Sequence, residues 1–451
     1  MIVNMPSIKK TQDILNVPTC SSVESFSGKN IHGRDVILLN PFADGGGDHE
    51  LANKIANIAI AESCRVTIIP IGVSVFTPAE DLPHRNISPQ AGHEHDISSL
   101  HDPIIIVAPV DIMPADKLKQ SIEDIFQQYQ LPKKDVILIE EMNVLTSKNA
   151  MEERVSCLNE MGFNSVTPCK LGFGDGAIGY LPVDQNTLTD IKNRFENELE
   201  KLMDSFNLSL DKQSNNHFAY ISSDFGITSA QVFVLNTLTE HMVNGDVNKE
   251  NSNYLICMRQ FDTLTKDTAQ KTMKDILTAK GDGFYSRAFY ANANILFANE
   301  TDKNLEMITQ LKGIGAGNIN IIFTGHLPKN IFEDFICLSK SGMASGDQSL
   351  SEFISITGKL PYYDMQPFKR PLASELVKMA SETGGNELKD EIISHISGRL
   401  PFTGKAQYKY LPILKQQPET VELAKNRTEL DRKISSNTAD TYIRNLLSSS
   451  N

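Results

Sequence analysis

The fold is decided by residues 35–70, DVILLNPFADGGGDHELANKIANIAIAESCRVTIIP. The apolar run at residues 36–39 predicts a buried strand, and three glycines separate it from a stretch that predicts a helix over residues 49–62. A second strand is expected over residues 65–70. A strand, a glycine loop, a helix and a strand are typical of the start of a doubly wound α/β domain, with the loop at the carboxyl edge of the sheet.

The same alternation continues to about residue 206. Further strands are expected at residues 103–108, 135–139 and 165–168, and helices at residues 115–129, 147–161 and 186–206. A polar break at residues 208–216 then indicates a domain boundary. We therefore expect a flexible arm over residues 1–30 and an N-terminal Rossmann-like domain over residues 31–213.

A second α/β series follows the break. Strands are expected at residues 218–222, 254–258, 294–297, 319–324 and 360–363, and helices at residues 228–242, 264–279, 302–312, 329–340, 349–357, 371–382 and 386–397. This series predicts a second Rossmann-like domain over residues 214–416, followed by a helical tail over residues 417–451. The predicted fold class is α/β, with two Rossmann-like domains that face each other across a cleft, where ligands of such folds bind.

Composition excludes some classes of function. The net charge of −13 argues against a nucleic-acid surface, because a phosphate backbone is bound by clustered Lys and Arg. The six cysteines lack a regular spacing and mostly lie in apolar runs, as expected of reduced, buried thiols. No apolar run has the length of a membrane span, and the N-terminus lacks the core of a signal peptide.

These features predict a cytoplasmic protein. The high content of Asn, Lys, Ile and Ser is typical of an AT-rich genome. An unstructured N-terminal arm is also compatible with a bacterial effector that is secreted into a host cell without a cleaved signal peptide, so this second localisation stays open.

The best functional signal is the stretch at residues 345–370, SGDQSLSEFISITGKLPYYDMQPFKR. Its polar turn (Gly346, Asp347, Gln348) leads into a short predicted helix, and a helix N-terminus offers N–H groups and a positive dipole end to a diphosphate. The alternative is structural, because Ser349 and Glu352 match the S-x-x-E capping box and need no ligand there.

The two halves together resemble the GT-B glycosyltransferases. In that superfamily the C-terminal domain carries a small-residue turn, a helix with a glutamate, then Gly-x-Pro and an apolar strand. Here these features are residues 345–349, Glu352 and residues 358–361, with one residue inserted before the proline. The resemblance implies that the second domain binds a nucleotide-diphosphate sugar.

Within this superfamily the chain most resembles the bacterial protein-arginine rhamnosyltransferases that modify an elongation factor. Their N-terminal loop has the spacing D-x-x-x-D, as at Asp44 and Asp48, and their C-terminal loop reads Gly-Glu-Asp-Ser before a helix that ends in Gly-Lys-Pro. This chain has Asp347 and Gln348 where the family has Glu and Asp. The resemblance implies inversion at the anomeric carbon, with Asp44 as base or acceptor-orienting group.

Each candidate residue has a functional and a structural interpretation. Asp44 and Asp48 are candidate catalytic carboxylates, or a turn residue and a helix N-cap. Ser223 is a candidate for the donor phosphates or a helix cap, and His326 a candidate for the donor or an ordinary turn residue. Arg259 would offset the leaving diphosphate or carry a surface charge, with Lys369 and Arg370 as alternatives. The candidate donor-binding residues are Ser223, Arg259, His326, Gly346, Asp347, Gln348, Ser349 and Glu352.

The predicted function is the metal-independent transfer of a sugar to an acceptor such as a protein side chain. No metal site is expected, because the spacing of His84, His93, His95 and His101 matches no common site and the sequence contains no Asp-x-Asp triplet. The expected partners are a nucleotide sugar and an acceptor, without nucleic acid, membrane span or bound cofactor. The alternatives are a sugar-nucleotide hydrolase or epimerase on the same fold, or a non-catalytic α/β module that binds another protein.

Overall fold

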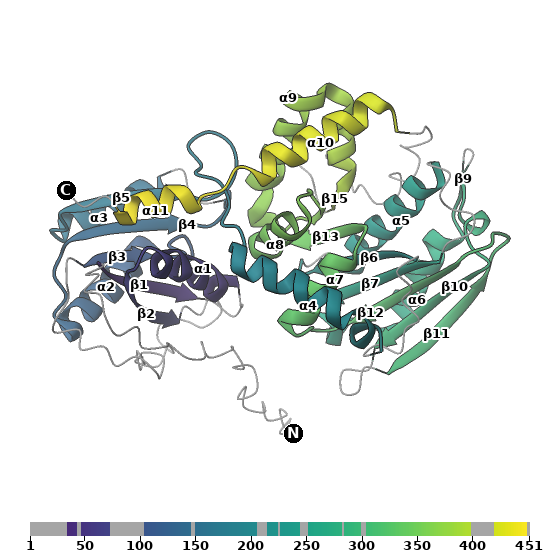
Figure 1. Ribbon diagram of the computed structural model, residues 1–451, viewed down its shortest axis with the longest axis horizontal. Helices are drawn as coiled ribbons and strands as arrows, with labels where there is room; N and C mark the ends of the chain where they lie inside the picture. The colour runs from purple at the N-terminus through teal and green to yellow at the C-terminus, as the bar shows by residue number, and fades with distance from the viewer. Residues whose placement is uncertain are drawn as a thin grey trace, which may run out of the picture.

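The computed structural model describes residues 34–42, 47–72, 103–145, 149–204, 214–223, 226–243, 251–281, 284–298, 304–397 and 419–448. The arm predicted over residues 1–30 lies outside these residues. Figure 1 shows two α/β domains side by side, each built on one large sheet. The prediction of two Rossmann-like domains is confirmed.

The first domain is built on a parallel five-stranded sheet in the order β2-β1-β3-β4-β5. Its strands are β1 (Asp35–Phe42), β2 (Arg65–Gly72), β3 (Ile104–Val107), β4 (Asp135–Glu140) and β5 (Ser165–Lys170). Helix α1 (Gly47–Ala61) packs on one face, and α2 (Ala115–Tyr129) and α3 (Ala150–Glu160) pack on the other. Since both faces are covered, the central strands are continuous apolar runs.

The second domain is built on an eight-stranded sheet in the order β11-β10-β12-β7-β6-β13-β14-β15. Its strands are β6 (Asn215–Ile221), β7 (Ser252–Met258), β10 (Asn292–Ala298), β11 (Leu305–Lys312), β12 (Asn318–Thr324), β13 (Ser341–Ser345), β14 (Tyr362–Asp364) and β15 (Ile396–Ser397). All neighbours are parallel except β10 and β11. A separate hairpin pairs β8 (Lys280–Gly281) with β9 (Phe284–Tyr285).

Helices cover both faces of this second sheet. On one face lie α5 (Ile227–Val243) and α6 (Lys266–Leu277), and on the other lie α7 (Lys329–Leu338) and α8 (Asp347–Thr357). Helix α9 (Arg370–His395) follows β14. The two helices predicted at its place are confirmed, because the backbone is non-helical at Gly384 and Gly385 and a kink there separates the two halves of α9. Short 3₁₀ turns lie at Phe261–Thr263, Ser286–Ala288 and Pro367–Lys369.

The helix predicted over residues 302–312 is wrong. This segment is strand β11, which pairs antiparallel with β10 and carries a register shift between Ile295 and Leu296. Its side chains are only partly buried or exposed, so its weak hydrophobic pattern did not distinguish an edge strand from a helix. The pairing with the preceding strand β10 decided the outcome.

Strand β13 was not predicted at all. Its sequence, SGMAS, contains no β-branched or aromatic residue, so it lacks the usual strand signal. It nevertheless lies between β6 and β14 near the centre of the sheet. Small residues suit this place, because a side chain at Gly342 would meet the ring of Phe353 in α8.

Three helices near the ends of the domains connect the two halves. Helix α4 (Gln185–Asp204) leaves the first domain and packs on α7, where Arg194 forms ion pairs with Glu333 and Asp334. Helix α10 (Val421–Ser435) packs on α9, and α11 (Asp440–Ser448) packs on α1 (Figure 1). One hydrophobic core therefore runs from the first sheet through α1 and α8 to the second sheet.

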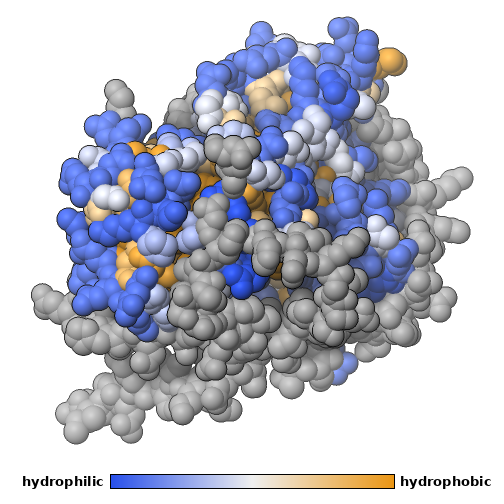
Figure 2. Space-filling model, turned by 60° about the vertical axis from the view of Figure 1, so that its left-hand side comes forward, coloured by the Kyte–Doolittle hydropathy of each residue, from blue (hydrophilic) through white to orange (hydrophobic). Residues whose placement is uncertain are grey.

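The described surface is mostly polar. Hydrophilic residues cover most of the described surface that Figure 2 shows. Within the described ranges, no helix combines the length and apolar character that a membrane span requires. Of the five described cysteines, Cys169 and Cys257 are buried and the others are partly exposed.

Candidate functional site

The strand order of each sheet contains a point where the chain changes direction. In the second sheet, strands β6 to β12 all lie on one side, and the chain then crosses over to β13 on the other side of β6, so the change lies between β6 and β13. In the first sheet it lies between β1 and β3. Ligands of doubly wound sheets bind outside the carboxyl ends of the strands at such points, because the connections on either side leave a crevice there.

The candidate residues after β6 and β13 meet at this point of the second sheet. The hydroxyl oxygens of Ser222 and Ser345 are 2.7 Å apart. Ser223 follows on one strand, and Gly346 begins the turn into α8 on the other. The structure therefore brings Ser223 and residues 346–349 to one crevice, although more than 120 residues separate them in the chain.

A buried carboxylate occupies the side of the crevice at the start of α5. Asp364, at the end of β14, is fully buried and accepts hydrogen bonds from the backbone N–H of Ser223 at 3.0 Å and from the hydroxyls of Ser223 and Ser229 at 2.5 and 2.6 Å. Several donors on one carboxylate offset its desolvation. The hydroxyl of Ser223 is thus engaged within the protein.

The other side of the crevice is the start of α8. The helix begins at Asp347 with Gly346 as N-cap, at φ 79°. The capping-box interpretation of Ser349 and Glu352 is wrong, because the N-cap is Gly346, three residues before the position that interpretation requires. Ser349 instead accepts from the N–H of Ser345 at 3.0 Å and donates to its carbonyl at 2.6 Å, which closes the turn between β13 and α8.

Three buried polar atoms near the carboxyl edge of the second sheet lack a hydrogen-bond partner among the residues that the structure describes. They are Thr324 Oγ1 at the end of β12, Gln348 Oε1 in the first turn of α8, and the hydroxyl of Tyr363 in β14. Buried polar groups are almost always paired, so each unpaired group needs an explanation.

Lys369 lies in a buried cluster of charges between the two domains. Its side chain is 1% exposed, and its ammonium nitrogen is 2.6 Å from Glu141 Oε2 and 2.7 Å from Asp347 Oδ2. Asp347 also accepts from the backbone N–H of Met142 at 3.0 Å. The first residue of α8 is therefore fixed to the loop after β4 of the opposite domain.

The carboxyl groups of this cluster have raised pKa values. Burial raises the pKa of Glu141 to about 7 and that of Asp347 to about 6, and the ammonium of Lys369 opposes both shifts. Burial likewise raises the pKa of Asp111 to about 6. For Lys369, burial lowers the pKa, but attraction to the three carboxylates outweighs it and the net shift is upward. Raised carboxyl pKa values in a crevice are typical of functional sites, although ion-pair networks also produce them.

A second set of charges lies where α1 meets α7 and α8. Lys329 in α7 pairs with Glu50 in α1 at 2.5 Å. Burial lowers the pKa of Lys54 and raises that of Glu352 to about 7, and each of these two groups partly offsets the shift of the other. Glu352 therefore lies at the domain interface beside α1.

The starts of α1 and α8 are in contact. A Cβ atom added to Gly47 would lie 3.6 Å from Cγ of Gln348. Asp48 lies in the first turn of α1, which begins at Gly47, so the N-cap interpretation of Asp48 is wrong. Asp48 also raises the pKa of Glu141, although less than burial does, and so belongs to the same electrostatic cluster.

Asn40 holds the start of α1 against the first sheet. It is fully buried at the end of β1, and its amide nitrogen donates to the carbonyls of Asp48 at 3.1 Å and of Ala108 at 2.9 Å. Its amide oxygen is 2.7 Å from Nδ1 of His49. These bonds fix the two ends of the loop that carries Asp44, a residue that itself lies outside the described residues.

The remaining candidates lie at the ends of neighbouring strands. Arg259 directly follows β7 and is exposed. Burial raises the pKa of Tyr220, and the charge of Arg259 offsets part of this rise. His326 follows β12 and is exposed. Both lie at the carboxyl edge of the second sheet, and their predicted roles in donor binding stay predictions.

Sequence reasoning missed Asn40, Asp111 and Glu141. Asp111 and Glu141 each follow a buried strand of the first sheet, which was an available signal because such positions meet at the carboxyl edge. The four histidines at positions 84, 93, 95 and 101 lie outside the described residues. Within the described ranges, no group of three or more His, Cys, Asp or Glu side chains is arranged to hold a metal ion.

Comparisons with known proteins give matches only among solved structures. No family model matches the chain, and no curated protein matches it. A trehalose-6-phosphate protein from E. coli bound with UDP-2-fluoro glucose is similar at 9% identity over 92% of this chain and 98% of that chain, with a TM-score of 0.43. A UDP-forming α,α-trehalose-phosphate synthase from Burkholderia xenovorans is similar at 10% identity over 92% and 97%, with a TM-score of 0.44.

A third match concerns the family that the two loops resemble. The structure that describes EarP-mediated arginine glycosylation of translation elongation factor EF-P is similar at 8% identity over 91% of this chain and 97% of that chain, with a TM-score of 0.40. Likeness at this level assigns neither a family nor an activity.

Proposed function

We propose that this protein is a metal-independent glycosyltransferase of the GT-B type, which moves a sugar from a nucleotide-diphosphate donor to an acceptor. The observation that carries the proposal is the contact between Gly47 and Gln348. This contact joins the loop after β1 to the loop after β13. The chain changes direction beside β1 in the first sheet and beside β13 in the second sheet. A two-substrate reaction needs two such binding edges close together.

The donor is proposed to lie at the start of α8. The first N–H groups of a helix lack intrahelical partners and, with the helix dipole, favour a diphosphate. Gly346 at φ 79° lies at this helix start, as does the amide oxygen of Gln348, which has no hydrogen-bond partner within the described ranges. Arg259 and His326 at the same sheet edge are proposed to contact the donor, and Asp347, Ser349 and Ser223 to hold the crevice in shape.

The reaction proposed here is a displacement at the anomeric carbon. The acceptor's lone pair forms the new bond to this carbon, and the bond to the diphosphate oxygen breaks, with its electron pair leaving on the nucleotide diphosphate. A carboxylate takes the acceptor's proton. Asp44 is proposed as this base and Asp48 as its neighbour, whereas Arg259 and the N–H groups of α8 stabilise the leaving group. The proposed acceptor is a protein side chain.

The test combines binding and product measurements on the full chain. Calorimetry against a panel of nucleotide-diphosphate sugars should identify one that binds, and mass spectrometry should then detect a glycosylated acceptor. Asp44→Ala should retain donor binding but lose transfer by roughly 100-fold or more, as expected for the loss of a general base. Gln348→Ala should weaken donor binding, and Asp175→Ala, whose side chain is fully exposed in another loop, is the matched control.

Other outcomes separate the alternatives. Free sugar released without an acceptor would indicate a hydrolase, and an isomeric nucleotide sugar would indicate an epimerase. If the native chain binds none of the nucleotide sugars, the proposal is wrong and a protein-binding module becomes the better hypothesis.

A further inference from the structure

A hollow of about 340 Å³ lies on the second sheet, away from the crevice described above. Seven side chains line it, and all of them are amides: Asn251, Asn253, Asn292, Asn294, Gln310, Asn318 and Asn320. They come from the amino-terminal parts of β7, β10 and β12, from the residue before β7, and from β11, which runs antiparallel to β10. The hollow therefore lies toward the opposite edge of the sheet from Gly346 and Gln348.

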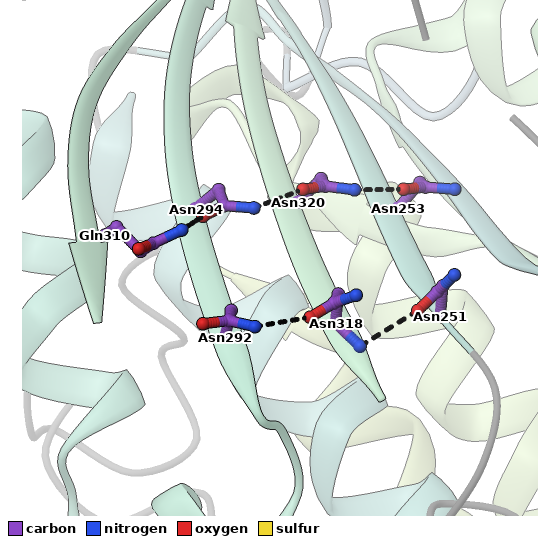
Figure 3. A pocket seen from close by; sticks show the side chains of 7 residues that line it. All are labelled: Asn251, Asn253, Asn292, Asn294, Gln310, Asn318 and Asn320. Atoms are coloured by element: carbon purple, nitrogen blue, oxygen red, sulfur yellow. Dashed lines mark hydrogen bonds between the residues drawn. The ribbon is translucent and has the colours of Figure 1, made fainter. Parts of the chain in front are cut away.

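The amides form two rows across the strands (Figure 3). In the longer row, Gln310 donates to Asn294 at 3.0 Å, Asn294 to Asn320 at 2.9 Å, and Asn320 to Asn253 at 2.8 Å. In the other row Asn292 donates to Asn318 at 2.9 Å. The spacing N-x-N repeats in three strands, because alternate residues of a strand point to the same face.

These rows hold the amides in fixed orientations but do not use their full capacity. A primary amide has two N–H donors and two acceptor positions. Each of Asn294 and Asn320 uses one donor and one acceptor position within the row. Each therefore keeps one donor and one acceptor position for a ligand, repeated at the strand spacing of about 4.8 Å.

The chemistry of the lining selects the kind of ligand. The residues that line the hollow carry no charge, and Lys312, which borders the shorter row, donates to the amide oxygen of Asn292 at 2.6 Å. The longer row therefore offers nothing specific to a phosphate, a carboxylate or a divalent cation. The lining also carries no apolar side chain, so it does not suit a hydrophobic peptide or lipid. Sugar hydroxyls both donate and accept hydrogen bonds, and a pyranose ring is about as long as one strand spacing. A neutral oligosaccharide therefore matches both the donor and acceptor positions of the amides and the spacing of the strands.

We propose that the two amide rows across β7, β10, β12 and β11 form a second binding site, which takes an extended neutral oligosaccharide with about one sugar over each strand. Because the lining contains no aromatic ring on which a sugar could stack, binding rests on hydrogen bonds that compete with water and is weak. Weak contacts suit a site that holds a glycan chain while the reaction takes place elsewhere.

The test uses the full chain with asparagine labelled with ¹⁵N. Maltohexaose, cellohexaose and chitohexaose are added separately at millimolar concentration, and a sulfated hexasaccharide serves as the charged probe. One neutral saccharide should shift the side-chain amide signals of Asn294 and Asn320, and saturation-transfer spectra should show its contact with the protein. The sulfated probe should bind no better.

The matched variant is the double substitution Asn294→Val and Asn320→Val. Valine favours strands, so the sheet is retained, and an unchanged circular dichroism spectrum checks this. Loss of four hydrogen-bonding positions should weaken saccharide binding by roughly tenfold or more. Gln348→Ala should leave it unchanged, which separates this site from the proposed donor site.

Two results would overturn the proposal. One is that no neutral saccharide shifts the asparagine side-chain signals of the native chain. The other is that a saccharide binds equally well to the folded double variant, which would place its site elsewhere.

Discussion

Replacing Lys369 by methionine should destabilise the contact between the two domains. Lys369 is 1% exposed and lies 2.6 and 2.7 Å from the carboxylates of Glu141 and Asp347. Methionine keeps much of the volume but removes the charge, which leaves buried carboxylates without their cation. Breaking a buried ion pair in this way costs about 3–5 kcal/mol.

The loss should depend on pH with a definite sign. The pKa values of Glu141 and Asp347 are raised to about 7 and about 6, so the folded state binds more protons than the unfolded state in this range. The free energy of unfolding contributed by these groups therefore falls as pH rises from about 4 to about 7. Without Lys369 their pKa values rise further, so the variant should lose more stability at about pH 8 than at about pH 5.

Urea unfolding, followed by circular dichroism at both pH values, measures this effect. The control is Lys378→Met in α9, because Lys378 is half-exposed and its carboxylate contacts are longer, at 3.7 and 3.8 Å. An exposed pair of this kind contributes about 0–1 kcal/mol. The reasoning is refuted if Lys369→Met unfolds at the same urea concentration as the native chain at alkaline pH, or if its loss is greater at acid pH.

Two further substitutions test the crevice and the strand that was not predicted. Asp364→Ala should lower the free energy of unfolding by about 1–3 kcal/mol, because the donors of Ser223 and Ser229 lose their acceptor; an unchanged thermal midpoint would contradict the structural role of Asp364. Gly342→Ala should destabilise by about 1–3 kcal/mol, since the new methyl group meets the ring of Phe353. Gly176→Ala, at φ +75° with open space around it, is its control and should show only a backbone cost of about 1 kcal/mol. Equal losses for the two glycine variants in thermal melts would argue against the packing explanation.

The regular parts of the fold could be predicted because their signals are local. The strands around Val36 and Ile105 are apolar runs, and α2 shows a clear helical period, so these elements were located to within a few residues. Strand β13 could not be predicted, because it has no strand-forming residues and its place depends on β6, which lies more than 100 residues earlier in the chain. Strand β11 was missed because its side chains are only partly buried or exposed, and it forms by pairing with the preceding strand β10.

The candidate site was predictable in part. The two loops at residues 44–48 and 346–349 were identified from the sequence, and the structure brings Gly47 and Gln348 into contact. The cluster of Asp111, Glu141 and Lys369 was not predicted, because it forms only when the two domains meet. The role of Asp364 was missed because its donors, Ser223 and Ser229, come from a part of the second domain more than 100 residues earlier in the chain.

The central claim is that both loops contact one nucleotide-diphosphate sugar and its acceptor. Hydrogen exchange, measured by mass spectrometry with and without the sugar nucleotide that calorimetry identifies, tests this claim most directly. The account predicts slower exchange in residues 343–357, at the start of α8, together with slower exchange at residues 43–51 when the acceptor is added. Binding that leaves both segments unchanged and protects another part of the chain would contradict it.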